Sequence, residues 1–188
     1  MSYAGPFCSP SPSRVGTIRE MAEHPEVFIS ATTRDLGSYR REIKDALLSL
    51  EIFPIEQSSF TLAYGPLTEM LHSLIGRCDV VIHLAGLYYG AEPPQRRPGE
   101  PHRSYTQIEY DVARKLGKPI YLFLATEDSE TDKTLAQTDE EKSLQIAHRQ
   151  TIESCGDIYY EFAGLETLRS IKGTPVPSPG CEGTAPSG

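Results

Sequence analysis

The sequence lacks any apolar run close to the ~20 residues that a membrane-spanning helix needs. Its N-terminus also lacks the basic and then apolar pattern of a secretory signal. The cysteines form no CxxC pair, which argues against a zinc site and for free thiols in a reducing compartment; they are Cys8, Cys78, Cys155 and Cys181. We therefore expect a cytoplasmic protein with no metal centre and no membrane partner.

Several sequence motifs of nucleotide and ester chemistry are missing too. The chain contains no GxGxxG, no GxxxxGK[ST] and no GxSxG, so nothing indicates Rossmann redox chemistry, a P-loop or a hydrolase elbow. Basic residues are in deficit, with 18 Lys and Arg against 26 Asp and Glu and a net charge of −8. This balance argues against non-specific binding to nucleic acid or to an anionic membrane surface.

Composition divides the chain into one domain and two tails. Residues 1–24 and 173–188 are rich in Ser, Pro and Gly and cannot bury a core. We expect a flexible N-terminal segment at 1–24 and a disordered tail or linker at 173–188. The 188 residues suffice for one domain with a sizeable core, which we place at 25–172.

Within that domain, apolar runs alternate with segments of helical periodicity. Ser38 and Ser104 are predicted to cap helices, and Gly117 to end the helix that follows Ser104. The predicted strands are 26–31, 53–55, 79–86, 119–125 and 158–162, and the predicted helices are 38–50, 66–75, 104–116, 138–153 and 165–171. Alternating strands and helices predict an α/β fold with a doubly wound, parallel five-stranded sheet of flavodoxin-like order 2-1-3-4-5.

In such a sheet, ligands bind beyond the carboxyl ends of the strands, where the strand order reverses. That rule selects the loop at 32–37, the loop at 87–103 and the start of the helix at Ser104. Glu109 lies in the second turn of this helix, beside the apolar positions Ile108 and Val112. A carboxylate there is partly desolvated, which raises its pKa and suits catalysis on a sugar. From spacing alone, an ordinary residue near a helix N-terminus is the favoured explanation.

Other candidates at the same edge also have two explanations. Thr32 and Arg34 could contact a phosphate or ribose, or could belong to a local turn. Tyr88 and Tyr89 could stack on a base or a nicotinamide ring, or could be half-buried wall residues. His83 is predicted to be a core histidine, because no ligand-type residue stands near it in the sequence.

Three segments together resemble the family called domain of unknown function 4062. They are VFISATTRDL at 27–36 with YRRE at 39–42, CDVVI at 78–82 continuing to Tyr89 and Gly90, and SYTQIEY at 104–110 with Ala113, GKP at 117–119 and LFL at 122–124. Their order and spacing carry the resemblance, which covers about residues 26–172. The family is similar to TIR domains, so the resemblance implies a TIR-like form of the predicted fold.

The resemblance also implies an activity. Enzymatic TIR domains hydrolyse NAD⁺ at the nicotinamide–ribose bond with a glutamate on the helix after the third strand, a position that Glu109 matches. This implies an NAD⁺ glycohydrolase that needs no cofactor. The implied substrate-binding residues are Ser30, Thr32 and Arg34 on the ribose–phosphate side, Tyr89 and Tyr105 around nicotinamide, and Ser104 at the helix start. The chain has no Trp, whereas TIR enzymes often carry one near this helix start, and Tyr105 is its replacement in this interpretation.

Members of the family often stand at the N-terminus of larger signalling or defence proteins. The resemblance therefore implies an effector or signalling domain in immune or antiphage defence, with self-association and a fused or separate ATPase or repeat partner. Two alternatives remain. Many TIR-like modules are adaptors that self-associate without catalysis, and the related nucleoside deoxyribosyltransferases transfer the glycosyl group from a glutamate on the corresponding helix.

Overall fold

The computed structural model describes residues 24–56, 67–94, 99–134 and 136–171. The C-terminal tail expected at 173–188, and all but the last residue of the segment expected at 1–24, lie outside the described residues.

Five strands form one parallel sheet with the order β2-β1-β3-β4-β5. The strands are β1 (Glu26–Ser30), β2 (Phe53–Ile55), β3 (Val80–Ala85), β4 (Ile120–Ala125) and β5 (Tyr159–Phe162). The helices between and after them are α1 (Gly37–Ser49), α2 (Leu67–Arg77), α3 (Tyr105–Lys115), α4 (Asp139–Ser154) and α5 (Leu165–Ile171). The predicted fold class and strand order are confirmed.

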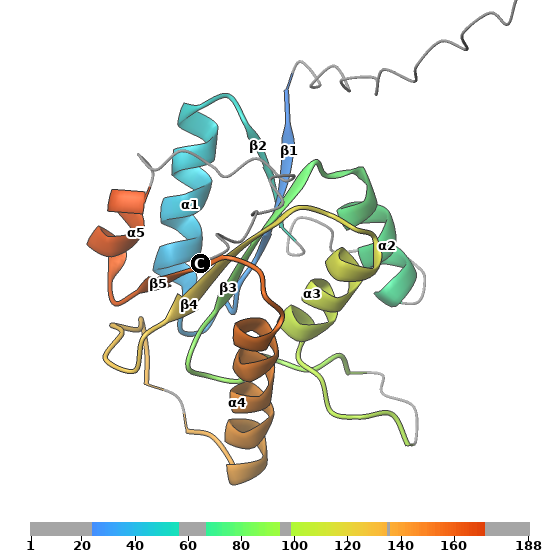
Figure 1. The fold of residues 1–188 in the computed structure, drawn as a ribbon, viewed down its shortest axis with the longest axis vertical. Helices are drawn as coiled ribbons and strands as arrows, with labels where there is room; N and C mark the ends of the chain where they lie inside the picture. The colour runs from blue at the N-terminus through green and yellow to red at the C-terminus, as the bar shows by residue number, and fades with distance from the viewer. Residues whose placement is uncertain (1–23, 57–66, 95–98, 135, 172–188) are drawn as a thin grey trace, which may run out of the picture.

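Helices cover both faces of the sheet (Figure 1). On one face, α1 and α5 pack over Val27 and Ile29 of β1. On the other face, α2 and α3 pack over Phe28 and Val81, while Ile152 brings α4 into contact with the residues of β4. Successive residues of β1 thus serve opposite cores, as the twofold side-chain alternation of a strand requires.

The start of α1 differs from its prediction as a Ser38-capped helix. The helix begins at Gly37 with Leu36 as its N-cap, and the N-cap residue makes no side-chain capping hydrogen bond. Ser38 lies within the first turn, where its backbone N–H donates a 2.7 Å hydrogen bond to Asp132 Oδ2. The Asp132 carboxylate, from the loop after β4, therefore takes the capping role expected of the serine hydroxyl. It accepts a hydrogen bond from a backbone N–H that has no partner within the helix.

Ser104 and Gly117 agree with their predictions. Ser104 is the N-cap of α3 and forms a capping box with Gln107. Gly117 follows the C-cap with φ of 63°, in the left-handed region that glycine adopts at little cost.

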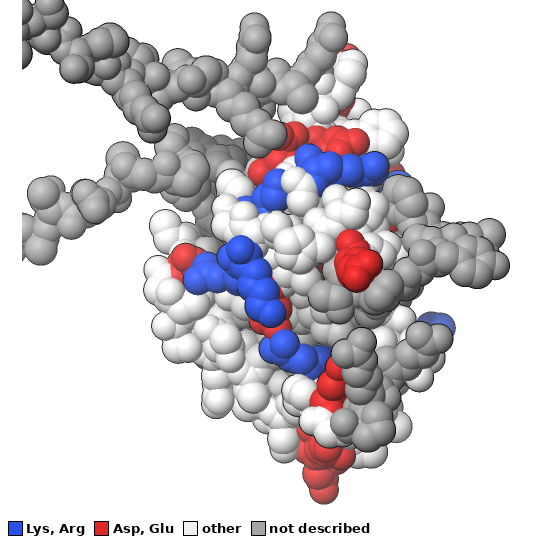
Figure 2. Space-filling model, turned by 90° about the vertical axis from the view of Figure 1, so that its right-hand side faces the viewer, with Lys and Arg blue, Asp and Glu red and all other residues white. Residues whose placement is uncertain are grey.

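Acidic and basic side chains lie next to one another on the face shown in Figure 2. Ion pairs join Arg103 to Asp111 and Arg114 to Asp157.

Among the residues that the structure describes, no helix combines the length and the apolar character needed to span a bilayer.

Candidate functional site

The candidate site centres on a contact between the end of β1 and the second turn of α3. Ser30 Oγ donates a 2.6 Å hydrogen bond to Glu109 Oε2. The capping box at Ser104 fixes where α3 begins, and Val112 anchors its inner face on the sheet. With the start and the inner face both set, Glu109 has to point at the carboxyl end of β1.

Glu109 is enclosed by protein, with 1% of its surface exposed. Burial raises the pKa of its carboxyl to about 7, while the Ser30 hydrogen bond and the Arg40 charge lower it. The raised pKa agrees in direction with the expectation from the sequence. Glu109 is more completely buried than the partial desolvation expected there. Near neutral pH the carboxyl therefore exists in both protonation states.

Two histidines extend the hydrogen-bonded chain away from Glu109. Ser30 and His83 are register partners on β1 and β3, and Ser30 Oγ lies 3.0 Å from His83 Nδ1. His83 Nε2 in turn lies 3.1 Å from His148 Nε2 of α4. Burial lowers the pKa of both imidazoles, well below the usual value for His83 and to about 4 for His148. His83 is a core histidine as predicted, but its link to Glu109 was not expected.

Arg40 is the cation near Glu109, which sequence reasoning did not identify. It lies on α1, is buried, and donates to Thr33 Oγ1 at 3.2 Å and to the Ile29 carbonyl at 3.5 Å. Arg34, the expected cation, is exposed. Arg40 belongs to the YRRE segment at 39–42. The only feature of the sequence that could have indicated its role is its place on the face of the helix that is buried.

The loops after β1 and β3 meet the start of α3 at Gly90. A Cβ atom added to Gly90 would lie 3.0 Å from Thr32 Cγ2 and 3.3 Å from Ser104 Cβ. Thr32 itself donates a short hydrogen bond to Asp35 Oδ1. The three segments selected by the strand-end rule are thus in direct contact, and their close packing depends on the missing side chain of Gly90.

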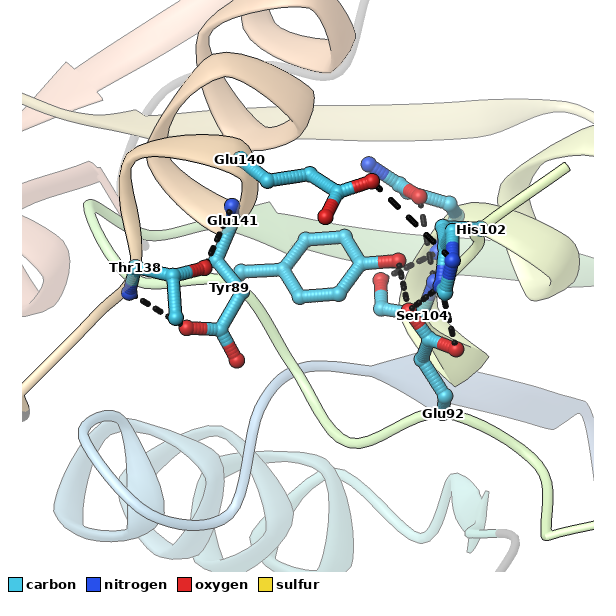
Figure 3. A network of polar contacts seen from close by, with 8 residues as sticks. Tyr89, Glu92, His102, Ser104, Thr138, Glu140 and Glu141 are labelled. Atoms are coloured by element: carbon cyan, nitrogen blue, oxygen red, sulfur yellow. Dashed lines mark hydrogen bonds and ion pairs between the residues drawn. The ribbon is translucent and has the colours of Figure 1, made fainter.

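Tyr89 and Tyr105 lie beside this contact, next to Gly90 and Ser104 in the sequence. Tyr89 is buried, and its hydroxyl donates a 3.0 Å hydrogen bond to Glu92 Oε1. His102 also contacts Glu92 at 2.9 Å and faces Glu140 at 4.0 Å, so this network joins the loop after β3 to the start of α4 (Figure 3). Tyr105 is half-buried, and its backbone N–H donates to the Ala91 carbonyl.

Side chains of α4 hold the carboxyl ends of β3 and β4 together. Arg149 donates to the carbonyls of Ala85 at 3.1 Å, Gly86 at 3.3 Å and Ala125 at 2.7 Å. Gln145 Nε2 also donates to the Gly86 carbonyl, at 2.8 Å. The loop at 32–37 was predicted to border the site, but nothing in the sequence indicated that α4 would do so.

No group of three or more His, Cys, Asp and Glu side chains in the described ranges is arranged to hold a metal ion. This edge of the sheet carries the buried carboxyls of Glu109 and Asp35, together with the Ser30 hydroxyl and the imidazoles of His83 and His148. A carboxyl of this kind can accept a proton, orient sugar hydroxyls or stabilise a nearby positive charge.

A family match covers most of the described domain. The family described as "Domain of unknown function (DUF4062)" matches residues 26–172. The chain belongs to the DUF4062 family. Among solved structures, this DUF4062 domain is similar to one described as "Structure of the activated Roq1 resistosome directly recognizing the pathogen effector XopQ (TIR domains)". The TM-score is 0.42 at 12% identity, over 70% of this chain and 72% of that chain. The comparison with curated proteins found no match.

The DUF4062 domain brings some of the expected site residues together and not others. Ser30 bonds directly to Glu109, and Thr32 and Ser104 meet across Gly90. Tyr89 is engaged with Glu92, and Arg34 lies at the surface. The substrate-binding roles of all six residues, and the catalytic role of Glu109, remain predictions.

Proposed function

We propose that this DUF4062 domain is a TIR-like NAD⁺ nucleosidase, in which Glu109 acts on the ribose next to nicotinamide. The observation that carries the proposal is the environment of Glu109. Its carboxyl lies at the carboxyl end of the parallel sheet, is buried, and bonds to a hydroxyl rather than to a guanidinium. Arg103, which could have neutralised it, pairs with Asp111 instead.

The reaction needs little from the protein beyond this carboxylate. As the bond between C1′ and the nicotinamide nitrogen breaks, its electron pair leaves with nicotinamide, which becomes neutral and requires no general acid. The ribose acquires oxocarbenium character, and an ionised carboxylate beside its hydroxyls stabilises that charge. Water then adds at C1′ and releases a proton, which gives ADP-ribose.

The closed state of Glu109 bears on how the domain would be activated. With 1% of the residue exposed, a ribose reaches the carboxylate only after side chains around it move. Self-association driven by a fused or separate ATPase or repeat partner would supply that rearrangement. The same closure favours a second candidate, in which the domain is a self-associating signalling adaptor that performs no chemistry.

The test is nicotinamide release from NAD⁺ by the purified chain, alone and after fusion to a dimerising tag. The proposed nucleosidase releases nicotinamide in at least one of these states, and Glu109→Gln lowers the rate by a factor of about 10² or more. The control is Glu153→Gln, an exposed glutamate on α4, which leaves the rate unchanged. Circular dichroism establishes that each variant is folded.

Each of the other results would reject the proposal of a nucleosidase that uses Glu109. Unaltered NAD⁺ in the clustered protein supports the adaptor. Exchange of an added free base into the product, in place of hydrolysis, supports a glycosyl transferase of the nucleoside deoxyribosyltransferase type. Full activity in Glu109→Gln removes Glu109 from the mechanism.

A further inference from the structure

The four-residue chain from Glu109 to His148 has unequal access to solvent along its length. Ser30 and His83 are fully buried, Glu109 is 1% exposed and His148 is 8% exposed. Of these four residues, His148 therefore has the most contact with water. The distances along the chain are 2.6, 3.0 and 3.1 Å, which are all hydrogen-bonding distances.

The donor and acceptor roles along this chain are linked. When Glu109 is ionised it only accepts, so the single Ser30 proton points at Glu109 and His83 must hold its proton on Nδ1 to donate to Ser30. His83 Nε2 is then an acceptor, and His148 must donate from Nε2. When Glu109 is protonated and donates to Ser30, every one of these roles reverses.

We propose that Ser30, His83 and His148 form a proton relay that carries a proton between solvent at His148 and the buried Glu109 carboxyl. A proton that binds His148 Nδ1 displaces the Nε2 proton onto His83 Nε2. His83 then releases its Nδ1 proton to Ser30 Oγ, and Ser30 releases its own to Glu109 Oε2. One proton enters, one carboxylate is neutralised, and both imidazoles end neutral with their tautomers exchanged.

The charged groups around the hydrogen-bonded residues favour the transfer of a proton over its retention on His148. Arg103, which precedes α3, and Arg149 on α4 lower the pKa of His148 together with burial, so an imidazolium there is unstable and passes its proton on. Arg40 on α1 is the cation near Glu109. The Tyr110 ring of α3 packs at 5.1 Å from His83 and 5.4 Å from His148, which holds both imidazoles in place.

The relay is independent of the reaction that Glu109 performs, whereas its effect on turnover rests on the proposed function. Under that function the relay lets the buried Glu109 exchange its proton with solvent, and the ionised form is the one that stabilises the sugar cation. Ser30, His83 and His148 act through Glu109, so they are positioning residues and not catalytic ones.

The test is a pH series of two-bond ¹H–¹⁵N NMR spectra of the full chain, because these spectra identify which ring nitrogen of each histidine carries the proton. We expect His83 to be protonated on Nδ1 and His148 on Nε2 in alkaline solution, and both to exchange tautomer at one midpoint, the pKa of Glu109 at about 7. Tautomers that stay fixed through this titration, or histidines that become imidazolium instead, would overturn the relay.

Three variants locate the path. Glu109→Gln does not titrate and holds the histidines in one tautomer pattern at every pH. Ser30→Ala disconnects the histidines from Glu109. We expect no tautomer exchange in either variant. Ser49→Ala, the control, removes an exposed hydroxyl at the end of α1, and this variant should still show the tautomer exchange. An exchange that persists in Ser30→Ala would also overturn the relay.

Turnover separates this inference from the proposed function. In an active protein, Ser30→Ala removes a hydrogen bond that lowers the pKa of Glu109, so the midpoint of the rate profile moves to higher pH. An unmoved midpoint counts against the relay. If no form of the protein releases nicotinamide, the nucleosidase is rejected, and the NMR series alone decides the relay.

Discussion

The Ser30 hydroxyl and the Glu109 carboxyl are joined by a 2.6 Å hydrogen bond inside the protein. This bond does not offset the cost of burying the carboxylate, because the pKa of Glu109 is still raised to about 7. The folded protein therefore binds a proton at Glu109 under conditions in which the unfolded chain has lost it. Through Glu109, the stability of the fold therefore depends on pH.

Glu109→Gln should gain stability relative to wild type as the pH rises. The folded pKa is about 7 and the ordinary value is 4.5, so the wild type loses stability as the pH increases between these values, and the loss is complete above the folded pKa. Glutamine does not titrate and avoids this loss. Between about pH 5 and about pH 8, the free energy of unfolding of the variant should rise by roughly 2–3 kcal/mol relative to wild type.

Urea unfolding of both proteins across this range measures the difference. His148 acts in the opposite sense, since its lowered pKa stabilises the fold above 6.5 and this stabilisation disappears as the pH falls towards about 4. Both proteins contain His148, so the difference between them reports chiefly the loss of the Glu109 titration. A difference that stays constant with pH would mean that Glu109 has an ordinary pKa in the folded state.

Elements of the fold follow from local patterns in the sequence. The run Val80–Ala85, which is apolar except for His83, predicts a strand covered on both faces, and the structure places it at the centre of the sheet. Ser104 caps α3 because its side chain and that of Gln107 satisfy each other's backbone groups. The prediction that Ser38 caps α1 was wrong. The acceptor at this helix end is Asp132, which comes from a distant loop, and local spacing in the sequence cannot indicate such a partner.

The same distinction applies to the candidate site. Helix periodicity and the rule for strand ends made Glu109 a candidate at this edge, and the family resemblance implied its catalytic role. Its partners Arg40, His83 and His148 were not identified, because three different elements bring them together across the sheet. In particular, His83 and His148 are 65 residues apart, and their spacing matches no ligand or catalytic motif.

Gly90→Ala should destabilise the protein, because the added methyl group would lie 3.0 Å from Thr32 Cγ2 and force the loops apart. We expect a loss of about 1–3 kcal/mol in the free energy of unfolding. The matched change is Gly76→Ala in α2, where nothing lies within 4 Å of the added atom. It should stabilise the protein by about 0.5–1 kcal/mol. Thermal unfolding of the two variants measures both effects, and equal midpoints would contradict the close packing at Gly90.

Ser104→Ala and Thr138→Ala remove equivalent caps from α3 and α4, since both residues form capping boxes. Thr138 is exposed, and its loss should cost about 1 kcal/mol. Ser104 is buried and also bonds to the Thr106 hydroxyl at 2.9 Å, so its loss should cost roughly 2 kcal/mol. Chemical denaturation compares them, and a smaller loss in Ser104→Ala would show that water reaches the vacated position.

Arg149→Met should be among the more damaging substitutions on α4, because it removes the guanidinium that donates to the carbonyls of Ala85, Gly86 and Ala125. Of these three, the Gly86 carbonyl keeps the Gln145 amide as a donor. We expect a loss of about 3 kcal/mol. Arg149→Lys keeps the charge but not the planar fork, so it should recover only part of this loss. The control is Arg114→Met, which breaks an exposed pair with Asp157 and should cost less than about 1 kcal/mol. Urea unfolding ranks the three variants. Full stability in Arg149→Lys would mean that charge alone, and not the three directed hydrogen bonds, holds the strand ends together.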